Sequence, residues 1–277
     1  MRFMLIFTMA ELIASLQGFQ GSDRALPNGA ASDTTDVVVR DLLKTLDWRG
    51  RDAIVKSLAQ ADPPRGALIM EVARTHPKIA TRRSAIKWLG RVGEEGICDT
   101  LNTMFGDGND SVILDAMSNR DDCDAAYVSP FLMSTDPDAR RHAFNTVSVI
   151  DRKSAISVSF DGLGDAHHGV RSAVGSFLAD EGGEALAILQ GALSDSLDLR
   201  RSTALRVLRL IGSEGLSLLE SAIYNGDWRD RLAAVDALAQ SADSASKLVL
   251  ERRLQVESHP RVVEALNHAL GMRADDE

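Results

Sequence analysis

Arginine recurs along this chain at an almost constant spacing, and guanidinium groups at fixed intervals could bind an anionic partner. In the second half of the chain the intervals are 31, 30 and 30 residues, and each arginine is followed by an apolar residue three and seven positions later. An alternative is an internal ladder, in which each arginine pairs with an acid, such as Asp136 or Asp227, of its own or the adjacent repeat. We favour the ladder, because one arginine at a fixed place in every repeat suits pairing between repeats. The set is Arg82, Arg140, Arg171, Arg201 and Arg231.

The residues that follow each arginine predict the elements that position it. After Arg231, the apolar residues Leu232, Val235 and Leu238 recur at the spacing of one helix face. A glycine- and acid-containing break comes next in other copies, for example at 212–215, and a second apolar run of helical period follows it. Each unit is therefore predicted to be a helix, a tight turn and a second helix.

One such hairpin cannot bury its apolar face alone, so neighbouring copies must stack. The predicted fold class is all-α, a right-handed α–α superhelix of stacked helical hairpins. We expect helices of about ten to fourteen residues between Val37 and Leu270, and no sheet.

The pattern resembles the HEAT repeats, most closely the short HEAT-like repeats of phycobilin lyases and of bacterial HEAT-repeat proteins. The matching residues are Asp-Pro-x-x-Arg at 136–140 and Arg-x-x-Ala-x-x-x-Leu at 82–89, 201–208 and 231–238. The resemblance covers roughly residues 76–271, and it is specific for the repeat and unspecific for activity. It implies an arginine ladder and an inner, concave curve lined by the second helices.

Composition divides the chain into three parts. Residues 1–35 are expected to form an N-terminal helix or tail followed by a flexible linker, 36–271 the HEAT-like array, and 272–277 a charged tail.

The apolar run at 1–17 could begin a secretory signal, but Glu11 interrupts it and no convincing cleavage site follows. We therefore favour a cytoplasmic protein, with export as the alternative. The copy between Asp107 and Met133 lacks its arginine, and we favour a drifted repeat over a flexible joint.

Charge and cysteine content restrict the function. Forty acidic against thirty-one basic side chains give a net charge of −9, which repels phosphate backbones and weighs against nucleic-acid binding. The two cysteines, Cys98 and Cys123, suggest a reducing compartment or no dependence on disulfides, and their spacing fits no zinc site.

We find no catalytic signature, and we predict no catalytic, cofactor-binding or metal-binding residues. The neighbours His167 and His168 would diverge by ~100° on a helix and are expected to be a surface pair. No His-Glu dipeptide occurs, which removes the di-iron branch of HEAT-like proteins, and there is neither a phosphate-binding glycine loop nor a nucleophile elbow. Trp88 is expected to pack between repeats, and Trp228 to cover the neighbouring repeat.

The leading functional hypothesis is a non-enzymatic scaffold that binds a protein partner on the concave face. An alternative that the resemblance implies is a bilin lyase, or a lyase chaperone, acting on a pigment-bearing partner. A HEAT-like DNA glycosylase is disfavoured by the charge and the few aromatics. No stable membrane insertion is expected. Residues one step off the buried stripes of the second helices are the predicted partner-binding patch: Gln190, Glu220 and Tyr224.

Overall fold

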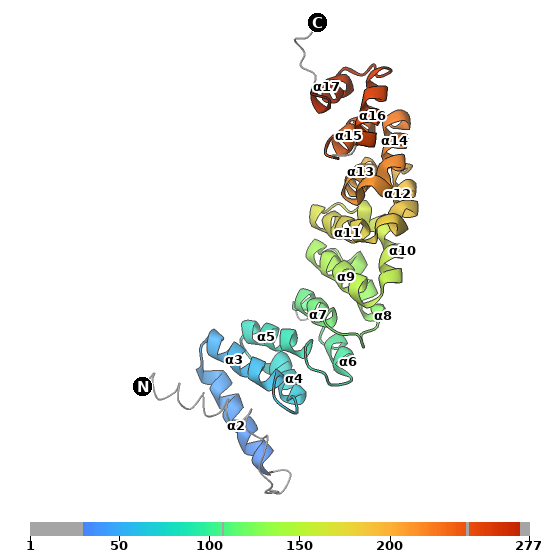
Figure 1. Ribbon diagram of the computed structural model, residues 1–277. Coiled ribbons are helices and arrows are strands. Elements are labelled where there is room, and N and C mark those ends of the chain that lie inside the picture. The colour runs from blue at the N-terminus through green and yellow to red at the C-terminus, as the bar shows by residue number, and fades with distance from the viewer. Residues whose placement is uncertain (1–29, 107, 242–243, 272–277) are drawn as a thin grey trace. The chain divides into compact units, whose positions relative to one another are not determined.

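A computed structural model describes residues 30–106, 108–241 and 244–271 (Figure 1). The regular elements in these ranges are helices, and none of these residues is in a strand. The apolar N-terminal run and the charged C-terminal tail lie outside the described residues. The chain divides into two compact units, Met1–Pro130 and Phe131–Glu277, and each is considered by itself.

Unit 1 begins, among its described residues, with α2 (Ala30–Thr45). Three pairs of helices follow: α3 (Trp48–Ala59) with α4 (Gly66–Thr75), α5 (Ile79–Leu89) with α6 (Ile97–Asn102), and α7 (Asp110–Met117) with the single turn α8 (Ala125–Val128). The 3-10 turn η1 (Ser129–Met133) comes next.

Unit 2 contains four hairpins and a last single helix. They are α9 (Pro137–Ile150) with α10 (Arg152–Leu163), α11 (His168–Glu181) with α12 (Leu186–Leu193), α13 (Asp198–Ile211) with α14 (Leu216–Asn225), α15 (Trp228–Ala239) with α16 (Ser244–Leu254), and α17 (Pro260–Ala269). The 3-10 turns η2 (Gly182–Ala185) and η3 (Gly212–Gly215) join the second and third pairs. The expected all-α, HEAT-like stack of hairpins is confirmed within each unit.

The core lies at the two positions that the arginine spacing marks. The residue three places after each arginine is 0% exposed, and the residue seven places after it is at most 1% exposed. The small side chain that often occupies the first position lets adjacent helices approach closely, and the larger aliphatic at the second fills the space between them. The first set is Ala85, Ala143, Val174, Ala204 and Ala234, and the second is Leu89, Val147, Leu178, Leu208 and Leu238.

Glycines and aspartates mark the ends of these helices. Gly182 and Gly212 have φ angles of 58° and 76°, a region that glycine enters freely, and they turn the chain after α11 and α13. Asp136 caps α9 by accepting a hydrogen bond from the amide of Asp138, and Pro137 occupies the first turn of that helix. The turn chemistry in the sequence therefore corresponds to the actual helix boundaries.

Two stretches differ from the sequence-based expectation in detail. α2 begins at Ala30, within the segment 1–35 that was expected to be a tail and linker. The copy expected to have drifted has shortened second-helix elements, α8 and η1, and the boundary between the two units follows Pro130.

The first helices of unit 2 form one continuous row. Each of α9, α11, α13, α15 and α17 packs against the next, whereas α10, α12, α14 and α16 pack mainly against first helices. Because the first helices lie closer together, they form the inner side of the bend of this unit, as Figure 1 shows. This differs from the expectation, implied by the resemblance, that second helices line the inner curve.

Cys98 and Cys123 form a disulfide, a pairing that the sequence analysis did not predict. Cys98 lies in α6, Cys123 lies in the turn before α8, and their Cα atoms are 5.3 Å apart. The spacing of 25 residues in the sequence did not reveal this pairing, because it spans one repeat and only the stacking brings the two side chains together. Persistent disulfides are typical of oxidising compartments.

Candidate binding surface

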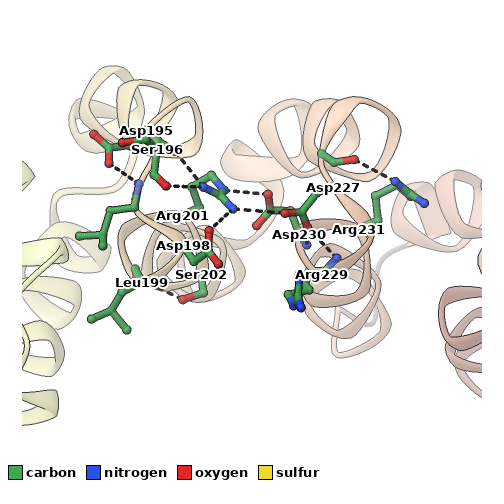
Figure 2. Close-up of polar contacts among 12 residues, drawn as sticks. Asp195, Ser196, Asp198, Leu199, Arg201, Ser202, Asp227, Arg229, Asp230 and Arg231 are labelled. Atoms are coloured by element: carbon green, nitrogen blue, oxygen red, sulfur yellow. Dashed lines mark hydrogen bonds and ion pairs between the residues drawn. The ribbon is translucent and has the colours of Figure 1, made fainter.

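Arg201 joins two consecutive repeats (Figure 2). Its Nη1 donates to the carbonyl oxygens of Asp195 and Ser196, at 2.9 and 3.2 Å, in the turn before its own helix. Its Nε donates to Asp230 of the next repeat at 2.7 Å, and its Nη2 donates to Asp198 at 2.7 Å and to Asp227 at 3.4 Å. Burial lowers the pKa of Arg201, but the hydrogen bonds that it donates to Asp230 and Asp198 outweigh this effect and raise the pKa overall. The guanidinium therefore stays charged and bound within the protein.

Arg140 makes the same pair of connections. Its Nη1 donates to the carbonyl of Ser134 at 2.7 Å, and its Nε and Nη2 bind both carboxylate oxygens of Asp165, at 2.7 and 2.8 Å. The hydrogen bonds from Arg140 hold the pKa of Asp165 below its usual value. A two-pronged contact of this kind fixes geometry as well as charge.

Arg231 ends at a fully buried acid, Glu257. The two side chains are joined by bonds of 2.8 and 3.0 Å, and Arg253 adds two more at 3.0 and 2.6 Å. The amides of Ser258 and His259 also donate to Glu257. Burial raises the pKa of Glu257, but these hydrogen bonds outweigh it and lower the pKa to about 2.

For the other two members of the arginine set, Arg171 and Arg82, the bonds from Nη1 go to carbonyl oxygens of the turn before their own helix. Nη1 of Arg171 donates to Asp165 and Ala166, and Nη1 of Arg82 donates to His76 and, at the limit of a bond, to Pro77. Asp136, expected to be a ladder acid, serves as a helix cap, while Asp227 both caps α15 and reaches Arg201. The acids that bind these arginines most closely from the next repeat are Asp165, Asp230 and Glu257, which the sequence analysis did not single out.

Arg51 belongs to the same series, although the sequence analysis did not include it. It stands 31 residues before Arg82, so the same spacing would have found it. Its Nε donates to Oγ1 of Thr81 in the next repeat at 2.7 Å, and its Nη1 donates to the carbonyl of Leu46. The two-way connection is therefore present in unit 1 with a neutral partner.

A groove of about 780 Å³ runs over the first helices of unit 1, and we call it the unit 1 groove. α3 supplies Trp48, which is 62% exposed, and α7 supplies Val112 and Asp115. Another wall of the groove comes from α5 and the residues just after it. It carries Arg83 and Lys87, on the helix, and Arg91, which follows its end. Residues four apart face the same side of a helix, so these cations line one wall.

A second groove, of about 570 Å³, lies between α9 and α11 and is called the unit 2 groove. Its walls are mostly neutral and polar, with Asn145 on one side and Ser172 and Ser176 on the other. Arg141 lines it but is bound to Asp138 of its own helix at 3.2 Å. Both grooves are thus formed by first helices.

The predicted partner-binding residues lie on second helices. Gln190 is exposed on α12, and Glu220 is half-buried and Tyr224 38% exposed on α14. The ring of Tyr224 lies 5.4 Å from the guanidinium of Arg253, which holds Glu257. One face of this tyrosine is therefore occupied within the protein.

The aromatic residues follow the expected packing roles. Trp228 stacks on His259 of the next repeat, with ring centroids 4.6 Å apart, so it covers its neighbour as expected. Trp88 is half-buried and lies against Arg91 and Lys56, at 5.0 and 6.0 Å.

Potential metal ligands come together at one place among the described residues. Cys98, Asp122 and Cys123 bring ligand atoms within 4.8 Å of one another, but the two sulfurs are bonded to each other and are not free thiolates. His167 and His168 are both exposed at the start of α11, as expected of a surface pair. Across the described part of the chain, no helix is long and apolar enough to span a bilayer.

Comparison with known proteins gives similarity only to solved structures. No protein-family model matches the chain, and no curated protein matches it. YibA of Escherichia coli is 14% identical, with a TM-score of 0.49 over 91% of this chain and 100% of that chain. An engineered protein is 15% identical, with a TM-score of 0.39 over 87% and 79% of the two chains. The complex of CpcE and CpcF of phycocyanin lyase from Nostoc is 15% identical, with a TM-score of 0.26 over 91% and 98%.

Similarities at this level carry no argument about function. The description of the fold as HEAT-like therefore rests on the hairpins, the core positions and the arginine contacts of this chain itself.

Proposed function

We propose that this protein is a non-enzymatic repeat scaffold that binds a partner protein on the exposed faces of its helices. The observation that carries this proposal is the contrast between the ladder arginines and the grooves. The guanidinium groups of Arg140, Arg201 and Arg231 are bound to carboxylates and carbonyls of the array itself. They hold the repeats in a fixed stack, and the exposed residues of the first helices are left to bind other molecules.

The first-helix faces are the favoured docking surface. The unit 1 and unit 2 grooves have volumes of about 780 and 570 Å³, in the range that accommodates side chains of a docked segment. The patch on the second helices, Gln190, Glu220 and Tyr224, is the alternative surface. It is the weaker candidate, because the Tyr224 ring already lies against Arg253.

Site-specific photo-crosslinking tests the proposal in the native host. A photoreactive amino acid would replace Ser176, in the unit 2 groove, or Gln190, on α12, in the full-length chain. The crosslinked protein would be identified by mass spectrometry, purified, and titrated against the wild-type chain. We expect a defined partner that crosslinks from Ser176 and binds the purified chain with saturation.

Two variants then locate the interface. Ser176→Arg, which fills the unit 2 groove, is compared with the double variant Glu220→Lys, Tyr224→Ala at equal melting temperature. A loss of affinity of about tenfold or more only in the double variant would move the interface to the second helices. If the purified partner does not bind the wild-type chain at all, the scaffold proposal is overturned.

A further inference from the structure

The unit 1 groove has the opposite charge character to the protein as a whole. The chain carries a net charge of −9, yet α5, from Ile79 to Leu89, contains no acidic residue. Arg83, Lys87 and Arg91 all line the groove. A local cationic wall on an acidic protein attracts anionic segments that the rest of the surface repels.

These three cations differ from the ladder arginines in their partners. Nε and Nη2 of Arg83 donate to the side-chain oxygen of Asn109 and the carbonyl of Gly108, both at 3.2 Å. The guanidinium of Arg91 lies over the ring of Trp88, and Lys87 is exposed. Among the residues that the structure describes, no carboxylate forms an ion pair with any of the three. Their charge is therefore free to act on a bound molecule.

The remaining walls add an aromatic surface and fixed polar groups. Trp48 is 62% exposed at the groove, with the guanidinium of Arg49 5.2 Å from its ring. Two carboxylates, Asp52 and Asp115, also line the groove, and Asp52 accepts a hydrogen bond from the hydroxyl of Ser84. The residues that line the groove therefore include three cations and two carboxylates. Their net charge is positive, and the three cations lie on one wall.

We infer that the unit 1 groove binds an acidic peptide segment of the partner protein. Positions four residues apart on a helix are about 6 Å apart along its axis. Alternate side chains of an extended peptide are separated by about 6.6 Å, so successive acids can face Arg83, Lys87 and Arg91 in turn. An apolar residue of the same peptide can then cover Trp48. This inference rests on the proposed protein-binding function and names the chemistry of the bound segment.

Fluorescence anisotropy with defined probes tests the inference on the full-length protein. The main probe is a labelled peptide of about eight residues in which glutamate alternates with leucine. The comparison probes are the same peptide with lysine in place of glutamate and a single-stranded oligonucleotide of equal negative charge. We expect the acidic peptide to bind with saturation, the lysine peptide not to bind, and the affinity for the acidic peptide to fall as salt is raised.

Charge reversal provides the matched variants. Arg83→Glu with Lys87→Glu should weaken acidic-peptide binding by about tenfold or more. Lys247→Glu with Arg252→Glu, on exposed positions of α16 in unit 2, changes the net charge by the same amount and should leave the affinity within about twofold. If the glutamates destabilise α5, Lys87→Ala with Arg91→Ala serves as a milder pair, and circular dichroism checks that each variant is folded.

Three results would overturn the inference. One is no binding of the acidic peptide to the wild-type chain, another is equal loss in both charge-reversal variants, and the third is tighter binding of the oligonucleotide than of the peptide. If the acidic peptide does not bind, a partner protein crosslinked through Ser176 still supports the scaffold proposal. Absence of any protein partner, with peptide binding retained, would instead count against the proposed function.

Discussion

Unit 2 and the stretch from α5 to α8 in unit 1 link their successive hairpins by different chemistry. In unit 2, Arg140, Arg201 and Arg231 reach an acid 25, 29 and 26 residues further along the chain. In unit 1, the residue 31 positions after Arg82 is Ile113, which is fully buried and can make no such bond.

At this gap two other links connect the turns. The disulfide between Cys98 and Cys123 joins α6 to the segment before α8. Arg120 donates to the carbonyls of Val92 and Glu94 and pairs with Asp122 at 2.7 Å. The disulfide and the Arg120 contacts thus lie where three repeats of unit 2 have an arginine–carboxylate pair.

The largest effect is expected at Glu257. Glu257→Gln would leave the guanidinium groups of Arg231 and Arg253 without their buried carboxylate, at a cost of about 3–5 kcal/mol in the free energy of unfolding. Urea unfolding at neutral pH measures this loss. Glu251→Gln, at an exposed acid of α16 that pairs with Lys247 at 3.8 Å, is the matched control and should change stability by less than about 0.5 kcal/mol.

The pH dependence sharpens the same prediction. The folded-state pKa of Glu257, about 2, lies below its ordinary value of 4.5. Its contribution to stability is therefore complete above pH 4.5 and is lost as the pH falls through 2. Unfolding midpoints should show this acid-dependent loss in the wild-type chain and a smaller one in Glu257→Gln. Identical pH profiles for the two proteins would show that the carboxylate is not held in its charged form.

Removal of the disulfide should have the next largest effect. The bond closes a loop of 25 residues, for which loop-closure entropy gives a stabilisation of about 3 kcal/mol. Cys98→Ser with Cys123→Ser should lower the free energy of unfolding of unit 1 by this order. A thiol reductant should lower the wild-type value equally and leave the double variant unchanged. A wild-type unfolding curve insensitive to reductant would mean that the bond does not contribute to the stability of the stack.

Arg201 and Arg171 test the ladder within unit 2. Arg201→Ala removes bonds to three carboxylates and should cost about 1–3 kcal/mol, because Asp230, whose side chain is 14% exposed, loses its partner. Arg171→Ala removes bonds to two carbonyl oxygens and should cost about 1 kcal/mol. Both losses are read from urea unfolding. If Arg201→Ala is as stable as the parent chain but loses a bound ligand, the arginine is a binding residue rather than a ladder residue.

The sequence revealed the parts of this architecture that repeat locally. The arginine spacing, the buried positions such as Ala204 and Leu208, and the turn glycine Gly212 all follow from one thirty-residue pattern. The acids that bind the arginines were missed, because Asp165 and Glu257 lie in turns, 25 and 26 residues after their arginines, whereas Asp230 lies in a helix, 29 residues after Arg201. Only the stacking of helices brings such pairs together.

The grooves and the disulfide were missed for a related reason. An exposed face carries no apolar period, so Arg83, Lys87 and Arg91 did not stand out, although a four-residue spacing places the first two on one side of α5 and the third just beyond its end. The pairing of Cys98 and Cys123 depends on which turns lie beside each other in space, and their separation in the sequence does not contain that information.

An effect as small as that of Arg171→Ala is expected at Arg51, whose bond to the next repeat has a neutral acceptor. Arg51 binds the hydroxyl of Thr81 where Arg140 and Arg231 bind carboxylates. Arg51→Ala should cost about 1 kcal/mol, because the bond joins a charged donor to a neutral acceptor that is itself buried. A double-mutant cycle with Thr81→Val isolates the contact, and its coupling energy should not change between pH 7 and pH 4, since Thr81 does not titrate in this range. The Arg231–Glu257 coupling, measured in the same way, should exceed it. Equal coupling at the two sites would mean that the charge of the acceptor adds nothing to the link between repeats.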